Sequence, residues 1–221
     1  MQIGRCIGMF TKDRNLVSSA QKGKYTSIQS LYSILPISAR THMERVGDYG
    51  ASFFEYLRDK NTELIDREFG SEFYIYAREV FCLHDIGRSF IPVSIINKVE
   101  KLTDEELEII KNHTTYAIQA IESLYANPFP DEVMMTFFKI ALYHHERVDG
   151  TGYPEKLSSE YIPYCAKVCA LVDTFDGITS WKPYRAKQVS KEQAVEIMRK
   201  DVGFQFDETL FNEFCEWIRL N

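Results

Sequence analysis

Histidine and aspartate side chains on the apolar faces of predicted helices are the feature that most constrains this chain. The chain has five histidines, and each stands three or four residues from an apolar residue. His42 precedes Val46 by four, for example, and His113 follows Ile110 by three. Because positions three and four apart share one face of a helix, these imidazoles are expected to point into the protein. Two aspartates are placed in the same way, so the complete inward-facing set is His42, His84, Asp85, His113, His144, His145 and Asp173.

Such a set needs a partner inside the protein. Burying unpaired imidazoles and carboxylates costs several kcal/mol apiece, whereas a whole domain is stable by only about 5–15 kcal/mol. Imidazole and carboxylate are metal ligands, and seven exceed the four that one zinc ion takes. Asp85 is the candidate bridge between two metals, because adjacent helical positions such as His84 and Asp85 diverge by about 100°. The sequence therefore predicts two divalent ions and, with their positive charge, an anionic substrate.

Helical periodicity recurs along the chain and strand signals are scarce, so the predicted fold class is all-α. With 221 residues, 45% of them hydrophobic, the chain fits one well-cored domain. Helices are predicted at about residues 38–59, 66–87, 103–121 and 131–145, and others begin near 163, 190 and 207. Thr103 with Glu106, and Ser190 with Gln193, have capping-box spacing. Residues 1–35 are interpreted as an extension packed on, or leading into, a domain over residues 36–221.

Charge and cysteine usage exclude several classes of protein. A net charge of −6 opposes binding to long nucleic acid or to an anionic membrane surface. The longest uncharged run, residues 25–39, has 15 residues and contains Pro36, too few to span a bilayer. Five cysteines are an odd number without a CxxC pair, which indicates reduced thiols and a cytoplasmic protein.

Several motifs together resemble one known family. His84-Asp85 is the signature dyad of the HD phosphohydrolase superfamily, and HHERVDGTGYP at residues 144–154 is similar to the motif that names its HD-GYP subfamily. The HxxRV at His42, the LTDEELEIIKNH ending at His113, the VDTFD holding Asp173 and the KPYR at residues 182–185 follow in the family's order and spacing. The resemblance covers about residues 36–215.

This resemblance implies an HD-type helical bundle with additional C-terminal helices that hydrolyses cyclic dinucleotides. The expected substrate is cyclic di-GMP, opened to linear pGpG and in some members cut to GMP, by a hydroxide that bridges the metals. Iron or manganese is expected, with zinc, nickel, cobalt or magnesium as other divalent candidates. One metal would take His42, His84, Asp85 and Asp173, and the other Asp85, His113, His144 and His145. Two metals are expected rather than three, because Ser38 stands one turn before His42 and Glu44 points to another face.

Residue 88 departs from the family pattern, since the usual HDxGK motif has arginine here at its last position. Arg88 is a candidate catalytic and substrate-binding residue. As a phosphate clamp it would equal or exceed lysine, but as a proton donor it would fail, because guanidinium stays charged. Capping of a helix C-terminus is the structural alternative.

Further site residues follow from the same resemblance. Asp149, Gly152, Tyr153, Lys182 and Arg185 are candidate substrate contacts, although Trp181 and Lys182 stand where the family commonly has Asp and Arg. The GYP loop is also a candidate contact for a signalling-protein partner. Glu146, as acceptor for an imidazole N–H, is expected to support the metal ligands. Asp176 is expected to do the same, with a merely exposed side chain as the alternative.

Three other functions stay open at this point. A cyclic GMP-AMP phosphodiesterase is the nearest, because the altered residues 181 and 182 lie where base recognition is expected. A non-catalytic sensor that binds a cyclic dinucleotide is favoured by Arg88 and opposed by the intact set of seven ligands. A purely structural, partner-binding domain gives no physical reason to keep buried metal ligands.

Overall fold

The computed structural model describes residues 27–221 except 99, 123, 125–127 and 181–186. Within those residues it contains helices and two isolated β-bridges but no strand, which confirms the all-α prediction. The α-helices are α2 (Ile28–Ser33), α3 (Ile37–Lys60), α4 (Thr62–Phe69), α5 (Phe73–Cys82), α6 (Val93–Ile96), α7 (Asp104–Lys111), α8 (His113–Glu122), α9 (Asp131–Tyr143), α10 (Tyr164–Thr179), α11 (Lys191–Met198) and α12 (Glu208–Leu220). The 3-10 segments are η1 (Leu83–Phe90), η2 (Ser159–Tyr161) and η3 (Arg199–Asp201).

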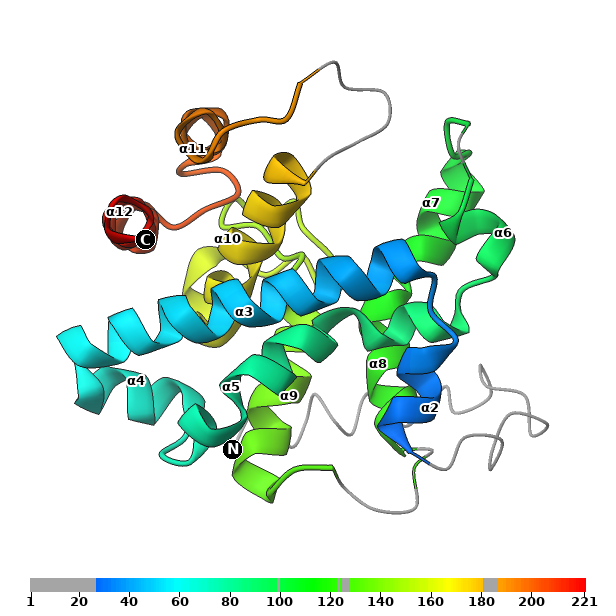
Figure 1. Ribbon diagram of the computed structural model, residues 1–221, viewed down its shortest axis with the longest axis horizontal. Coiled ribbons are helices and arrows are strands. Elements are labelled where there is room, and N and C mark those ends of the chain that lie inside the picture. Colours follow the sequence, from blue (N-terminus) through cyan, green and yellow to red (C-terminus); the bar gives the residue numbers. More distant parts are fainter. Residues whose placement is uncertain (1–26, 99, 123, 125–127, 181–186) are drawn as a thin grey trace.

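Helix α3 runs across the molecule and packs against both α5 and α10 (Figure 1). Its buried face includes Met43, Val46 and Phe53, and this apolar stripe fixes which side of the helix meets the core. Gly50 lets α5 approach closely, because a Cβ there would lie only 2.4 Å from Cγ of Phe81. The close approach brings the start of η1, with His84 and Asp85, next to α3.

Two predicted helices are each broken in the structure. The helix expected over residues 66–87 is wrong: α4 ends at Phe69, Gly70 takes a φ of +98°, and α5 gives way to the 3-10 segment η1. The helix expected over residues 103–121 begins with the predicted capping box of Thr103 and Glu106 but is interrupted at Asn112. The second break makes His113 the first residue of α8.

The C-terminal helices α11 and α12 lie side by side at one edge of the molecule (Figure 1). The predicted Ser190–Gln193 capping box opens α11, and the Asp207 side chain caps α12. From α12, Phe214 packs edge-on against Phe53 of α3 and Phe175 of α10, with ring centroids 5.3 and 5.5 Å apart. These contacts join α12 to the helices that carry His42 and Asp173.

Helix α2 contributes buried Ile28 and Leu31 to the same core. The proposed division at residue 36 stays a prediction, because residues 1–26 lie outside the described part of the chain. Among the described helices, none combines the length and apolar character needed to cross a membrane.

Candidate metal centre

The seven predicted ligands meet at one place. Two overlapping groups have ligand atoms that all lie within 4.8 Å of one another, and Asp85 belongs to both. One group is Asp85, His113, His144 and His145, and the other is His42, His84 and Asp85. Asp173 joins the second group, because its Oδ1 lies 3.0 Å from Nε2 of His42 and 3.7 Å from Nε2 of His84. The two groups have the same members as the two sets that the family resemblance implies.

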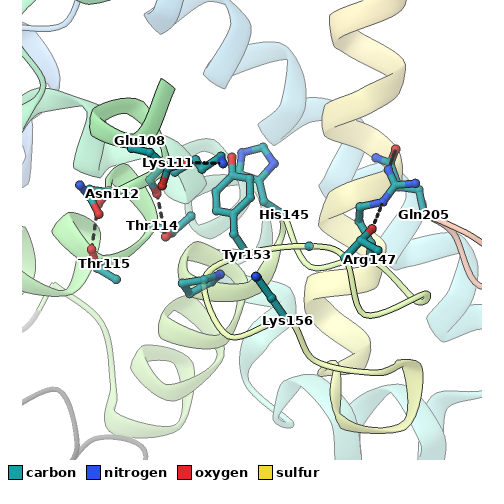
Figure 2. A pocket seen from close by; sticks show the side chains of 13 residues that line it. Glu108, Lys111, Asn112, Thr114, Thr115, His145, Arg147, Tyr153, Lys156 and Gln205 are labelled. Carbon is teal, nitrogen blue, oxygen red and sulfur yellow. Dashed lines mark hydrogen bonds and ion pairs between the residues drawn. The ribbon is translucent and has the colours of Figure 1, made fainter. Parts of the chain in front are cut away.

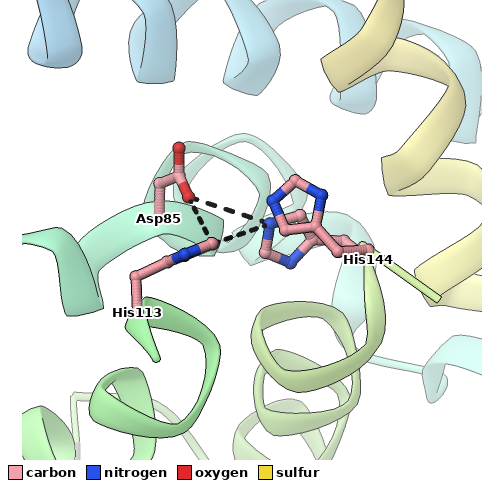
Figure 3. A group of neighbouring side chains, drawn as sticks. Asp85, His113 and His144 are labelled. Carbon is pink, nitrogen blue, oxygen red and sulfur yellow. Dashed lines mark hydrogen bonds and ion pairs between the residues drawn. The ribbon is translucent and has the colours of Figure 1, made fainter. Parts of the chain in front are cut away.

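The two carboxylate oxygens of Asp85 face different histidines. Oδ1 lies 3.0 Å from Nε2 of His113 and 3.7 Å from Nε2 of His144, as Figure 3 shows. Oδ2 lies 3.4 Å from Nε2 of His84 and 3.8 Å from Nε2 of His42. A carboxylate with one oxygen directed at each group has the geometry of a bridging ligand.

Local backbone geometry sets the tautomer of three histidines. Nδ1 of His84 lies 2.8 Å from the carbonyl of Phe81, and Nδ1 of His113 lies 2.7 Å from that of Ile110. Nδ1 of His144 similarly lies 3.0 Å from the Ile140 carbonyl. Because a carbonyl only accepts, each Nδ1 must carry the proton, which leaves the Nε2 lone pair directed at the centre.

Several atoms at the centre are buried without a hydrogen bond. They include Nε2 of His84, Nε2 of His145 and both carboxylate oxygens of Asp85. Leaving such atoms unsatisfied costs about 1–3 kcal/mol each, and more for a charged group. Divalent transition metals take imidazole nitrogen and carboxylate oxygen as ligands, so this donor set fits metal ions.

The ionisation states of Asp85, His144 and His145 suit metal binding. Burial raises the pKa of Asp85, but the nearby Arg88 guanidinium and the surrounding imidazoles outweigh it and hold the pKa well below its usual range. Burial lowers the pKa of His144 and of His145. Ionised carboxylate and neutral imidazole are the forms that bind metals. At His84 burial lowers the pKa, but the Asp85 and Asp173 carboxylates outweigh it and raise the pKa to about 10, so a metal that binds there must displace a proton.

Arg88 lies at the edge of this centre. Its Nε is 2.8 Å from Oδ2 of Asp85, and its side chain is 28% exposed. The guanidinium therefore sits between the buried carboxylate and the exterior, where it can meet an incoming anion. Arg88 forms this ion pair with Asp85, and it also lies in the last turn of η1, where the structural alternative places it.

Glu146 has a different role from the predicted one. Its two carboxylate oxygens accept from the backbone N–H groups of Glu155, at 2.7 Å, and Leu157, at 2.9 Å. The prediction that Glu146 accepts from an imidazole is therefore wrong. Because Glu146 follows His145 directly, these hydrogen bonds connect the GYP loop to the end of α9. No local sequence signal predicts this role.

Within the GYP loop, the predicted substrate contacts differ in their surroundings. Oδ1 of Asp149 accepts from the backbone N–H and the hydroxyl of Thr151, so this carboxylate shapes the turn. Gly152 allows the GYP loop to approach the backbone at residues 146 and 147 closely, because a Cβ there would lie 2.4 Å from the backbone nitrogen of Arg147. The Tyr153 ring stacks on the His145 ring, with centroids 4.8 Å apart, and so borders the candidate metal centre.

A cavity of about 660 Å³ opens beside His145 and Tyr153 (Figure 2). It lies between the α7–α8 junction and the GYP loop, and Lys111, Arg147 and Lys156 bring positive charge to its wall. Sequence reasoning missed these three basic residues, because they are scattered along an acidic chain and only the fold collects them. Lys182 and Arg185, like Trp181, lie outside the described residues.

The architecture and the site define the class of protein. A helical bundle built around a His-Asp dyad and further histidines is an HD-type arrangement, and the HD domain family matches residues 78–210. The chain belongs to the HD domain family, whose phosphohydrolases are metal-dependent. Within it, the predicted HD-GYP resemblance is confirmed by similarity to proteins named as cyclic dinucleotide phosphodiesterases.

Three of these relatives cover most of the chain. A cyclic di-GMP phosphodiesterase of Vibrio cholerae is 30% identical over 203 residues, which are 91% of this chain and 40% of the relative. A cyclic di-GMP phosphodiesterase of Thermotoga maritima is 34% identical over 156 residues, 71% of this chain and 38% of the relative. The 3'3'-cGAMP-specific phosphodiesterase 3 of Vibrio cholerae is 30% identical over 172 residues, 77% of this chain and 33% of the relative. The chain thus spans well under half the length of each.

Proposed function

We propose that this chain is a metal-dependent phosphodiesterase that opens a cyclic dinucleotide, with cyclic di-GMP as the first candidate and linear pGpG as its product. The observation that carries the proposal is Asp85, whose two oxygens face two separate groups of histidines. The names of the relatives supply the substrate class.

The seven side chains would hold two ions, iron or manganese in the first instance. His42, His84, Asp85 and Asp173 would hold one, and Asp85, His113, His144 and His145 the other. Two divalent ions held there supply Lewis-acid charge for phosphoryl oxygens and lower the pKa of a water molecule.

Arg88 is proposed to grip the phosphate that is cut. Its guanidinium has five N–H donors in a planar fork, and Asp85 faces only the Nε of that fork. Asp85 thus contacts the Nε of a side chain that is 28% exposed. A planar fork matches two phosphate oxygens, which a lysine ammonium does not.

The cavity beside His145 is the proposed place for one nucleotide of the substrate. Its volume of about 660 Å³ is within the range of about 300–1,000 Å³ typical of ligand pockets. Tyr153 offers an aromatic ring and Lys156 offers positive charge, whereas Lys111 forms an ion pair with Glu108, which lines the same cavity. Local attraction of this kind is what an acidic chain needs to bind an anion.

A second candidate substrate is 3'3'-cGAMP, because relatives named for that specificity match the chain as well. A sensor that binds the nucleotide without cutting it is the non-catalytic alternative. We further infer a cytoplasmic location from the thiols of Cys82, Cys165, Cys169 and Cys215, which are free. A signalling partner at the GYP loop stays a prediction.

The test is product analysis with both nucleotides. Protein purified without oxygen and reloaded with Mn²⁺ or Fe²⁺ is incubated with cyclic di-GMP and, in parallel, with 3'3'-cGAMP, and the products are separated by chromatography. We expect a linear dinucleotide from at least one, and none from Asp85→Ala, which removes the shared carboxylate. Unchanged cyclic substrates with two metals bound per chain would contradict the proposal and favour the sensor.

A further inference from the structure

One histidine of the centre is oriented by a carboxylate on another helix. His84, His113 and His144 are held by main-chain carbonyls close to them in the sequence. His42 is held by a side chain instead: its Nδ1 lies 2.6 Å from Oδ2 of Asp176, which is on another helix. Its orientation therefore depends on a residue that can be substituted.

Asp176 is itself fixed on both oxygens. Arg45 donates from Nε to Oδ1 at 2.5 Å and from a terminal nitrogen to Oδ2 at 2.9 Å. The Ser180 hydroxyl lies 2.9 Å from Oδ2. The Asp176 side chain is 1% exposed, so the arginine also supplies the countercharge that a buried carboxylate needs.

The chain spacing explains this arrangement. His42 and Arg45 are three apart on α3, and Asp176 and Ser180 are four apart, at the end of α10 and just beyond it. Each pair therefore lies on one helical face, and the two faces meet beside the metal centre. On its other side, His42 directs Nε2 at Oδ1 of Asp173, 3.0 Å away.

We propose that Arg45 and Asp176 are positioning residues that hold His42, so that only one of the two metal sites depends on this side-chain brace. The inference rests on the two-metal part of the proposed function. Asp176 fixes the proton on Nδ1 and leaves Nε2 as the ligand atom, while Arg45 fixes Asp176. Among the described residues, no hydrogen bond or ion pair joins His113, His144 or His145 to Arg45 or Asp176, although both sites share Asp85.

The test measures Mn²⁺ affinity instead of catalysis. Metal-free protein is titrated with Mn²⁺, and free Mn²⁺ is followed by electron paramagnetic resonance to obtain two dissociation constants. Asp176→Asn should weaken one site by about 10–100-fold, the usual effect of removing a partner of a ligating histidine, and leave the other unchanged. Asp66→Asn is the matched control, because it breaks the 2.8 Å pair with Arg58 at the far end of α3.

A double-mutant cycle identifies the affected site. In a His42→Ala background, Asp176→Asn should have no further effect, since the side chain that it orients is gone. In a His113→Ala background, the remaining site should stay sensitive to Asp176→Asn. Equal weakening of both sites, no weakening, or an undiminished effect in the His42→Ala background would each overturn the proposal, as would fewer than two sites in the unmodified protein.

A second variant guards against misfolding. Arg45→Lys keeps the positive charge beside the buried Asp176 carboxylate but loses the two-point contact, so it should fold and weaken the same site by a smaller factor. Failure of the proposed function can be told apart from failure of this inference. If Asp176→Asn weakens one Mn²⁺ site in a protein that cuts neither nucleotide, the role of Arg45 and Asp176 is supported and the proposed function is contradicted. If the protein cuts a nucleotide but Asp176→Asn leaves both Mn²⁺ affinities unchanged, the proposed function is supported and the role of Arg45 and Asp176 is contradicted.

Discussion

Arg88 lies closer to the candidate metal centre than its position near the end of η1 suggests. Its guanidinium contacts the one carboxylate that both histidine groups share, and it is partly exposed on the outer side. A group in that position acts either by gripping a phosphate or by giving up a proton. The pKa of Arg88 is raised further, because the charges of Asp85 and Asp173 outweigh the effect of burial, which favours the grip.

The substitution Arg88→Lys separates these roles. If Arg88 grips phosphate, exchanging two parallel hydrogen bonds for a point charge should weaken substrate binding by about 1–3 kcal/mol without raising kcat. Steady-state kinetics at equal metal loading would measure both quantities. A clearly higher kcat for the lysine variant would show that the position needs a titratable donor.

Single residues differed in how well the sequence predicted them. The seven candidate ligands, which the structure brings together, could be singled out because helical spacing and an apolar face are local properties, visible without the fold. Glu146 was misread, and Arg45 was named only as the arginine of the HxxRV motif with no role given, because their partners lie 9 to 11 and 131 residues away in the sequence. Contacts of that kind are set by how elements pack.

Among the elements, the contact between η1 and α8 places the central ligands. Gly87 of η1 lies against the start of α8, and a Cβ there would sit 1.9 Å from the His113 carbonyl and 2.5 Å from the Ala117 nitrogen. Both neighbours are backbone atoms, which cannot move aside as a side chain can. Gly87, the last residue of the helix predicted over residues 66–87, is therefore also the contact point between two segments that carry candidate ligands.

We expect Gly87→Ala to be strongly destabilising and to reduce metal content. Overpacking typically costs about 1–3 kcal/mol, and a clash with backbone should reach or exceed the top of that range. Gly177→Ala is the matched control, because no atom lies within 4 Å of a Cβ there. In α10 that substitution should stabilise by about 0.5–1 kcal/mol. Denaturant unfolding of both variants measures the difference, and equal effects would contradict the packing argument.

Helix existence was easier to predict than helix continuity. The expected starts near 131, 163, 190 and 207 agree with α9 to α12, since proline or capping side chains mark each one locally. The breaks at Gly70 and Asn112 interrupt otherwise helical patterns. Their position reflects how α5 and α8 must turn to meet α3 and η1, which periodicity alone does not encode.

For the whole molecule, the centre concentrates polar groups that the rest of the fold surrounds with apolar side chains. His84, Asp85, His113 and His144 are all buried among a core of aromatic and aliphatic residues. A ligand that binds only the folded state adds its binding free energy to stability. Stability and metal occupancy should therefore be linked.

We expect a chelator to lower Tm and added Mn²⁺ to restore it. At a free Mn²⁺ concentration 100 times the dissociation constant, one site contributes about 2.7 kcal/mol. Thermal unfolding with and without Mn²⁺ measures this, and His113→Ala should show a smaller gain because one site has lost a ligand. If the Tm of the unmodified protein did not change when Mn²⁺ is added, that result would argue against metal ions at this centre.

The Glu146 carboxylate has a consequence for how the surface of this molecule can vary. Surface loops commonly accept insertions and deletions, because few contacts depend on their length. Here one side chain reaches the amides of Glu155 and Leu157, and the residue before it is His145. If a residue were added or removed between Glu146 and Glu155, the Glu146 carboxylate could reach these two amides only if the neighbouring His145 imidazole moved. The loop is thus exposed in part yet fixed in length, and homologous chains that keep the acidic residue should also keep the spacing.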